Sequence, residues 1–516
     1  MSTTQPDARA TKYLVTASDG LFALAALVVG YLWWSWLWPR EGPGGGTDSM
    51  TTYLPNVAVV AFFVVAFGVS VAYYRAQHVH LDAGAWTWAG ATLTASLPFV
   101  LYTATPVHVL WGIVLLASFV LWHAHVSRTA QARSLDAGLI ADALNQALCT
   151  PGRNAGAWWA GLTQLRGRGR ARSVGVAVLG LIVAAPVIAG VIALLMSADP
   201  TFQLGASRVA DALGRLNAFS VGWKAILGIP VAIGLFALWY AHSRQQRTTT
   251  ITRSTLHRVA RAVRRIQPLA LAAPTAALCL VYLVFFVAMG SYLFSGFAGV
   301  LPDGYTYADY ARRGFLELAA VTVVNAAVIG FTAAMSRRTE TGYPRSLRAL
   351  GLVLSVETLA LIAISASKMV LYVRAYGLTE LRLYTLWYLA VALVAFVLVA
   401  VRHVRRFAMD RAVVITVLVG LLVLAFGNAD GLVARYNVDG YLAGTQRTVD
   451  VSYLATGLSD AAVPQLARLA DRAPDPAVAA QATQALQNAG HAECAAGIPW
   501  TAWNWQRHLA RQAVGC

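Results

Sequence analysis

Long apolar runs alternate along this chain with connectors, and every second connector, with one exception, is rich in arginine. The runs are long enough to cross the roughly 30 Å hydrocarbon core of a bilayer as helices. Connectors that would lie on one side hold 25 Lys and Arg residues, whereas those on the other side hold 7. Because cytoplasmic loops of membrane proteins carry an excess of Lys and Arg, this bias indicates both insertion and orientation. The sequence therefore predicts an all-α, polytopic transmembrane helical bundle.

About eleven spans are expected. They lie near residues 20–38, 54–74, 84–103, 107–123, 173–196, 220–241, 268–294, 314–335, 349–372, 384–401 and 411–426. With eleven spans, all the arginine-rich connectors fall on the cytoplasmic side. We therefore expect a bacterial plasma (inner) membrane protein with a cytoplasmic N-terminus and an extracytoplasmic C-terminus.

The composition argues against a nucleic-acid-binding role in spite of a net charge of +17. Charged residues make up 12% of the chain, about half the share that is typical of soluble domains. The arginines lie at span ends, where they would meet anionic lipid headgroups. The expected partners are therefore the lipid bilayer and its anionic headgroups, with the substrate or protein partner unknown and no nucleic acid.

Composition divides the chain into five segments. They are a cytoplasmic N-terminal tail at 1–19, a four-span module at 20–123, a cytoplasmic basic and amphipathic connector at 124–172, a seven-span core at 173–426, and an extracytoplasmic helical tail at 427–516. Residues 134–149, 206–216 and 254–266 repeat apolar residues at helical spacing. These helices either lie on the membrane surface or cap the bundle.

The tail gains polar residues and proline and loses the long apolar runs. Residues 460–490 read as two short helices broken by Pro474 and Pro476. Cys494 and Cys516 both lie here, and outside the cytoplasm they could form a disulfide. Against this, two cysteines are weak evidence for a bridge, and Cys516 ends the chain, where fraying is common.

Ionisable residues inside a membrane are costly and point to function by default. Glu317 and Lys368 fall in consecutive antiparallel spans at similar distances from the outer face, so we expect an ion pair. A structural pair that pins two helices is the alternative. Glu357 lies nearer the cytoplasmic side, with Asn325 at comparable depth, so it is hydrogen-bonded, protonated or open to water. Together the four form a polar intramembrane seam that either lines a cavity or binds two helices.

No catalytic signature is visible in the sequence. A Walker loop, HExxH, GxSxG and a dinucleotide fingerprint after a strand are all absent, so the sequence predicts no catalytic residue and no cofactor. The histidines near span ends, such as His123, His125 and His242, lack the spacing of metal ligands. We expect them at the surface or in contact with headgroups, with no metal site.

Four stretches are distinctive. They read LLMSADPTF (194–202), LPDGYTYADYARRGFLELAAVTVVN (301–325), KMVLYVRAYGLTELRLYTLWYLA (368–390) and NADGLVARYN (428–437). Over roughly residues 190–450 the chain resembles the bacterial multi-pass membrane proteins grouped as domain of unknown function 4173. That resemblance implies a membrane protein without an assigned activity. It directs attention to an outer-face cluster made of Tyr305, Tyr307, Tyr310, Arg312, Arg313, Tyr372, Arg374, Tyr376 and Arg382.

Three functional hypotheses remain open. The first is a permease-like or scaffold protein with a polar seam near the outer leaflet. The second is a membrane sensor or assembly factor that uses the extracytoplasmic tail. The third is an intramembrane enzyme on a lipid-linked substrate, in which only Glu317 or Glu357 could act as acid or base. A water-filled cavity at Glu357 would favour transport or catalysis, whereas a dry seam would favour a scaffold or sensor.

Overall fold

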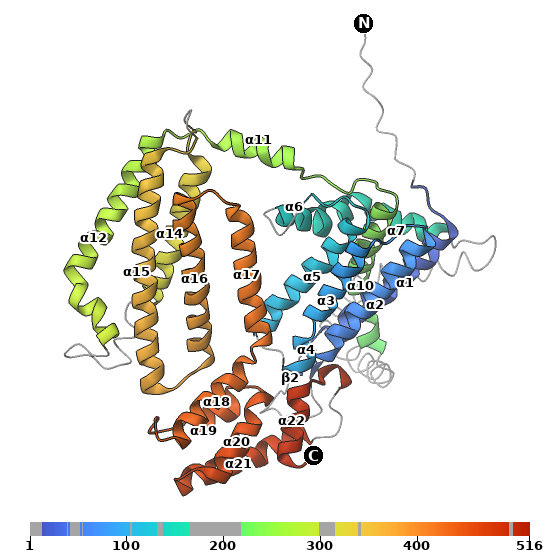
Figure 1. The fold of residues 1–516 in the computed structure, drawn as a ribbon. Helices are drawn as coiled ribbons and strands as arrows, with labels where there is room; N and C mark the ends of the chain where they lie inside the picture. Colours follow the sequence, from blue (N-terminus) through green and yellow to red (C-terminus); the bar gives the residue numbers. More distant parts are fainter. Residues whose placement is uncertain are drawn as a thin grey trace, which may run out of the picture.

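The computed structural model describes most of the chain as helices (Figure 1). It describes residues 13–38, 40–41, 52–53, 55–103, 106–131, 138–164, 218–298, 315–338, 342–494 and 499–516, with the backbone alone at 40–41, 52–53, 164, 218–219, 253, 257, 291–298, 315–319 and 492–493. Among these residues, strands are limited to a two-residue antiparallel pair, β1 (Arg40–Glu41) with β2 (Thr52–Tyr53). The predicted all-α fold is thus confirmed.

Eight described helices are long and apolar enough to cross a membrane. They are α1 (Ala17–Trp36), α2 (Val57–Ala76), α5 (Pro106–Val126), α10 (Ala218–Ser243), α12 (Pro268–Ala298), α15 (Arg345–Tyr376), α16 (Glu380–Val404) and α17 (Met409–Phe426). A further apolar helix, α14 (Phe315–Met335), lies where the span at 314–335 is expected. The predicted span at 173–196 and the amphipathic segment at 206–216 lie outside the described residues.

The span predicted at 84–103 is wrong as a single helix. The chain forms α3 (Ala83–Ala95) and then the single turn α4 (Pro98–Leu101). Ser96 is buried, and its hydroxyl donates to the Leu93 carbonyl at 2.6 Å, while Pro98 has no N–H to continue the helical ladder. Hydropathy alone therefore merged two short helices into one span.

The spans form two groups. The N-terminal bundle consists of α1, α2, α3, α5 and α10, and the C-terminal bundle consists of α12, α14, α15, α16 and α17 (Figure 1). In the first bundle α10 packs on α1 so closely that a Cβ on Gly30 would meet the Gly228 carbonyl. In the second, α15 is central and packs on α12, α14 and α16. The two bundles meet where α5 contacts α17.

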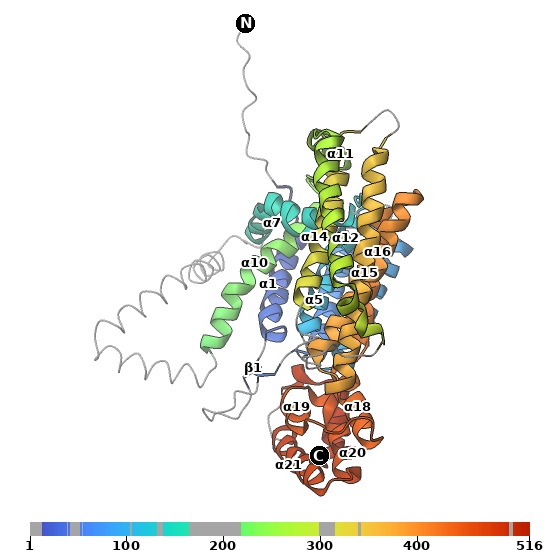
Figure 2. The ribbon, with the colours of Figure 1, turned by 90° about the vertical axis from the view of Figure 1, so that its left-hand side faces the viewer.

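Short helices cover the two ends of the spans. At one end, called here the α11 end, lie α6 (Gly138–Leu144), a π-helical turn (Asn145–Cys149), α7 (Thr150–Gln164) and α11 (Arg253–Val263). The helices that follow α17 lie at the opposite end, called here the tail end (Figures 1 and 2). The start of α1 is at the α11 end, so the described N-terminal residues and the C-terminus lie at opposite ends.

The amphipathic helix predicted at 134–149 is formed by α6 and the π-helical turn, and its polar side faces the protein. Ile140, Leu144 and Leu148 are exposed, at successive i,i+4 positions. Asn145 is fully buried, and its side chain donates to the Ile251 carbonyl at 2.9 Å and accepts from the backbone amides of Thr250 and Ile251. This helix caps the bundle, and its row of exposed apolar side chains also suits contact with a membrane surface, so the two interpretations do not exclude each other.

The tail is a cluster of short helices with its own apolar core. The helices are α18 (Ala429–Leu442), α19 (Val451–Thr456), a 3-10 turn at Asp460–Ala462, α20 (Val463–Arg472), α21 (Pro476–Glu493), a second 3-10 turn at Trp500–Ala502 and α22 (Trp505–Val514). Val438, Leu454, Leu466 and Leu469 are buried together. The two helices expected at 460–490 are α20 and α21, with Pro476 at the start of α21, where its missing N–H is not needed.

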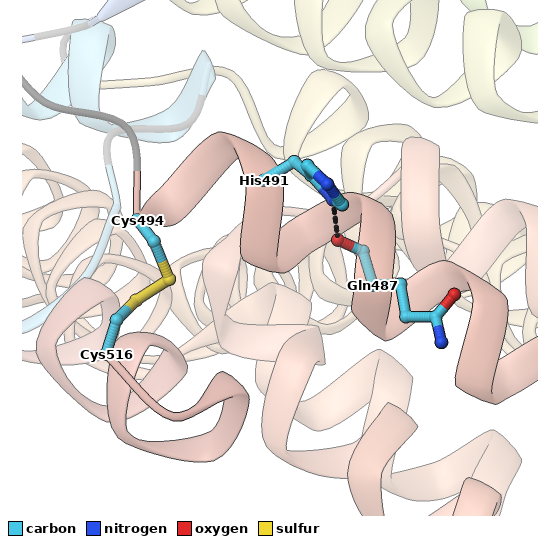
Figure 3. Close-up of a disulfide and its surroundings, with 4 residues drawn as sticks. All are labelled: Gln487, His491, Cys494 and Cys516. Carbon is cyan, nitrogen blue, oxygen red and sulfur yellow. Dashed lines mark hydrogen bonds between the residues drawn. A yellow bond between two sulfur atoms is a disulfide. The ribbon is translucent and has the colours of Figure 1, made fainter.

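A disulfide joins Cys494 and Cys516 (Figure 3). Cys494 directly follows α21, and His491 one turn earlier interacts through Nδ1 with the Gln487 carbonyl. Cys516 follows α22, so the bridge ties the last helix of the chain to the end of α21. The cysteines elsewhere, Cys149 and Cys279, are free thiols.

Candidate functional site

One residue of the predicted seam, Asn325, forms hydrogen bonds to two other helices. Asn325 of α14 is fully buried. Its Oδ1 accepts from the hydroxyl of Tyr282 in α12 at 2.8 Å, and its Nδ2 donates to Thr358 Oγ1 in α15 at 2.9 Å. This side chain therefore connects α12, α14 and α15 within the bundle interior.

Asn325, the candidate partner considered for Glu357, donates to Thr358 instead. Neighbouring helical residues point about 100° apart, so a helix that turns Thr358 toward α14 turns Glu357 away from it. Glu357 faces α12, where it interacts with the thiol of Cys279. Its Oε2 is buried and has no hydrogen-bond partner among the described residues.

Lys368 lies on the buried side of α15, 2% exposed, on the same side as Leu361 and Ile364. The side chain of Glu317 lies outside the described residues, so the Glu317–Lys368 ion pair stays a prediction. Leu361 and Ile364 pack against Tyr282 and Phe285. Between Thr358 and Lys368 the buried side of α15 thus carries these apolar side chains and Ser365, whose hydroxyl donates to the Leu361 carbonyl at 2.8 Å.

Two more hydrogen bonds extend the connections across the C-terminal bundle. The hydroxyls of Thr322 in α14 and Tyr388 in α16 are 2.6 Å apart. The indole N–H of Trp387 in α16 donates to the Gly420 carbonyl of α17 at 2.8 Å. Together with Asn325, these contacts link all the helices of this bundle into one bonded series.

Part of the outer-face cluster gathers at the tail end of α15. The guanidinium of Arg382 lies 4.0 Å from the centroid of the Tyr372 ring, and the rings of Tyr372 and Tyr376 are 5.4 Å apart. Arg382 also donates to the Tyr376 carbonyl at 3.0 Å, which closes the loop between α15 and α16. Tyr305, Tyr307, Tyr310, Arg312 and Arg313 lie outside the described residues.

Arg374 stands between two cavities. One, of about 560 Å³, lies between α15 and α16 and is lined mainly by apolar side chains. The other, of about 650 Å³, lies against α18 and is lined by Arg435, Tyr436 and Gln446 among others. Arg374 lines both, so the apolar groove between α15 and α16 and the polar cavity on the tail share this residue.

The tail is hydrogen-bonded to the C-terminal bundle through Asn437 of α18. Its amide donates to the Leu378 carbonyl and its Oδ1 accepts from the Leu378 N–H, both at 2.7 Å. Gly377, at φ +76°, allows this approach, because a Cβ there would meet Asn437 Oδ1. The Tyr453 hydroxyl accepts from the backbone N–H of Glu380 at 2.9 Å.

The tail is also bonded to the N-terminal bundle. The N–H of Asn56 donates to the Thr501 carbonyl at 2.8 Å. Thr103 donates to Asp460 at 3.0 Å, and Arg507 forms an ion pair with the same carboxylate at 2.9 Å. The side chains of both Arg507 and Asp460 are largely buried, at 9% and 15% exposure. The tail therefore contacts both bundles through polar bonds.

A buried polar network at the α11 end was missed by the sequence analysis. Asp19, assigned there to a polar N-terminal tail, belongs to α1 and is 0% exposed. Its carboxylate forms an ion pair with Arg244 at 2.8 Å and accepts from Tyr73 at 2.9 Å and Gln77 at 3.1 Å. The signal was present, since Thr16 and Asp19 have the spacing of a capping box before an apolar run.

The interpretation of His123 and His242 as surface residues is also wrong. His123 is 0% exposed and His242 is 1% exposed. Nδ1 of His242 lies 2.7 Å from Ser127 Oγ, and Nε2 lies 2.7 Å from Gln146 Oε1. The helix formed by α6 and α7 covers this end of the bundle, and span boundaries alone could not reveal that cover. No group of three or more metal-ligating side chains occurs in the described part of the chain.

A family model matches residues 61–469 and carries the description Domain of unknown function (DUF4153). The chain belongs to this family. The resemblance to domain of unknown function 4173 is therefore corrected: the family is a different one, and the match begins well before residue 190. No curated protein and no solved structure matches the chain. This DUF4153 member is an integral membrane protein by its helices, and its family description assigns no activity.

Proposed function

We propose that this DUF4153 protein is a membrane scaffold whose tail holds two helical bundles in one arrangement. The observation that carries the proposal is the set of polar bonds from the tail to both bundles: Asn437 to Leu378 on one side, Asp460 to Thr103 on the other. Each buried hydrogen bond of this kind stabilises by about 1 kcal/mol, and charged ones by more. Relative motion of the bundles would have to break several of them together.

The bonded seam supports the same function. Asn325 accepts a hydrogen bond from Tyr282 and donates one to Thr358. The hydroxyl of Thr358 in turn donates to the Leu354 carbonyl. Hydrogen bonds of this kind between polar side chains bind helices to one another. The permease-like alternative needs one repeat or bundle to rock against the other around a central site.

The proposed orientation places the α11 end in the cytoplasm of a bacterium and the tail outside its plasma membrane. Two features support this. The arginines of the described connectors gather at the α11 end, as the positive-inside rule requires for a cytoplasmic face. The Cys494–Cys516 disulfide suits an oxidising compartment.

A sensor is the second candidate, and the cavities of the tail favour it. A cavity of about 730 Å³ lies among α19, α20 and α21, and the polar cavity at Arg374 opens beside α18. A ligand bound there would contact helices that are bonded to both bundles. In the sensor hypothesis, ligand binding to the tail changes the spans through these polar bonds.

Distance measurements between the bundles test the scaffold. Cys149 and Cys279 are replaced by Ser, and spin labels are attached at His80→Cys and Arg405→Cys, two exposed positions at the α11 ends of different bundles. In liposomes, a scaffold gives one narrow distance distribution, unchanged by pH or a membrane potential. Two populations that exchange with these conditions would support a permease and contradict the proposal.

A matched pair of substitutions tests whether the tail sets that distance. Asp460→Asn weakens the contacts to Thr103 and Arg507, whereas Asp471→Asn removes an exposed ion pair with Arg472 on the tail surface. We expect the first change to broaden the distribution and the second to leave it unchanged. Equal distributions in both variants would show that the tail does not hold the bundles.

A further inference from the structure

A cavity of about 830 Å³ opens at the α11 end of the C-terminal bundle, between α14, α15, α16 and α17. Its mouth is lined by four arginines, Arg338, Arg348, Arg402 and Arg406, and by His403. These residues come from the segment after α14, the first turn of α15, and the end of α16 with the segment after it. Separate segments therefore bring cations to one opening.

Among the described residues that line this cavity there is no carboxylate, and none of the ion pairs among the described residues involves its arginines. Burial and the guanidinium groups of Arg264 and Arg402 lower the pKa of Arg338. Cations held this close repel one another, and a bound anion relieves that repulsion. The electrostatic character of the opening is thus that of an anion site.

Two of the side chains at the mouth are already held in place. The guanidinium of Arg338 lies 5.0 Å from the Tyr343 ring centroid and donates to the Ala333 carbonyl at 3.2 Å. The ring of His403 packs on Gly351, where a Cβ would collide with Nε2, and its Nδ1 lies 2.7 Å from the Val399 carbonyl. Positioned groups lose less side-chain entropy when a ligand binds.

The deeper wall of the same cavity is apolar. Ile329, Gly330, Phe396 and Val399 line it, and all belong to the apolar parts of α14 and α16. A free phosphate would contact only the mouth, whereas an amphiphile would place an anionic head among the arginines and a chain along this wall. Basic pockets between spanning helices recognise lipid headgroups in this way.

We propose that this cavity binds an anionic phospholipid of the leaflet at the α11 end, with its phosphate between Arg348, Arg402 and Arg406 and an acyl chain against Gly330. The positive-inside rule alone predicts only diffuse attraction of headgroups to all basic residues. A specific lipid site instead predicts that the arginines lining the cavity contribute more to lipid affinity than the neighbouring arginines do. This inference is independent of the scaffold, because a permease or sensor could hold the same lipid.

The test is a titration of the purified full chain in a zwitterionic detergent with dioleoyl phosphatidylglycerol, followed by native mass spectrometry. Arg402→Gln with Arg406→Gln removes two cavity charges. Arg405→Gln with Arg411→Gln is the matched control, because both residues are exposed, lie in the same region and do not line the cavity. We expect about a tenfold or greater loss of affinity for the first pair and less than a twofold change for the control. Equal losses would overturn the built site.

A second variant keeps every charge and separates a lipid from a soluble phosphate compound. Gly330→Leu adds a side chain where a Cβ meets nothing within 4 Å, so it is expected to occupy the space along the apolar wall. We expect weaker binding of dioleoyl phosphatidylglycerol, and weak binding of glycerol 3-phosphate and dioleoyl phosphatidylcholine to the unchanged protein. Glycerol 3-phosphate that binds as tightly as the lipid, or a Gly330→Leu variant with unchanged lipid affinity, would overturn the lipid assignment.

Discussion

Loss of Arg244 is expected to destabilise this protein more than loss of any exposed arginine. Arg244→Gln leaves the Asp19 carboxylate, which is 0% exposed, without its cation. Breaking a buried ion pair by removing one partner costs about 3–5 kcal/mol, because the remaining charge stays out of water. Tyr73 and Gln77 still donate to Asp19, as does the Thr16 backbone, so the loss should fall near 3 kcal/mol.

The chain offers a matched control in a second Arg–Asp pair at the same end. Arg128 and Asp82 are 3.5 Å apart with side chains 79% and 41% exposed. Exposed pairs contribute about 0–1 kcal/mol, so Arg128→Gln should change the free energy of unfolding little. The assay is equilibrium unfolding by sodium dodecyl sulfate in bicelles. A loss below about 1 kcal/mol for Arg244→Gln, or equal losses for the two variants, would refute the reasoning.

A double-mutant cycle separates the pair from its surroundings. Asp19→Asn removes the buried charge, and the remaining Arg244, 21% exposed, can still reach water. The double variant Asp19→Asn, Arg244→Gln should therefore be more stable than the sum of the single losses predicts, by more than about 1 kcal/mol. Additive losses would mean that Arg244 acts through its contact with the Tyr240 ring instead, 5.2 Å from its guanidinium.

Three further predictions concern packing, the disulfide and pH. Gly228→Ala should destabilise by about 1–3 kcal/mol, because its Cβ would meet the Gly30 backbone, whereas Gly234→Ala on the same helix, with nothing within 4 Å, should be neutral or stabilising; equal effects in unfolding assays would contradict the close approach. Cys494→Ser should lower tail stability by up to about 3 kcal/mol for a separation of 22 residues, and thiol labelling of the denatured, unreduced protein should find only Cys149 and Cys279; four labelled thiols would contradict the bridge. The hydrogen bond from Arg468, followed by that from Arg435, lowers the pKa of Asp439 from 3.8, so its stabilising contribution is present above that pH and is lost as pH falls through the lower folded-state value. Arg468→Gln should reduce this acid dependence in thermal unfolding of the tail between pH 2 and 5, and an unchanged pH profile would count against it.

Hydropathy and charge were sufficient to predict where most helices lie. The expected spans at 349–372 and 384–401 fall inside α15 and α16, because long apolar runs have few alternatives in a bilayer. Short-range chemistry changed the outcome at 84–103, where the side chain of Ser96 and the ring of Pro98 interrupt the helix. A hydropathy window averages over such single residues.

Which side chains hydrogen-bond each other inside the bundle could not be predicted from the sequence. Depth arguments paired Glu357 with Asn325, but rotation of α15 by one residue presents Thr358 to Asn325 instead. That rotation is set by packing of Leu361 and Ile364 against α12 residues such as Tyr282 and Phe285, which are distant in sequence. Depth follows from sequence position, whereas the facing partner follows from tertiary packing.

The arginines show how far a charge pattern can be interpreted. The number of arginines on each side predicts the orientation of the chain in the membrane. For that prediction Arg402, Arg405 and Arg406 are equivalent. In the structure they are not equivalent, because Arg402 and Arg406 line the cavity and Arg405 does not. Arg402 lies one residue before His403, whose ring fits only because residue 351 of α15 is glycine. Anion binding at the α11 end therefore depends on which basic residues line the cavity between the helices. The number of arginines in a connector does not reveal this. A charge-matched comparison of variants at one helix end is consequently the measurement that distinguishes a binding site from a topology signal.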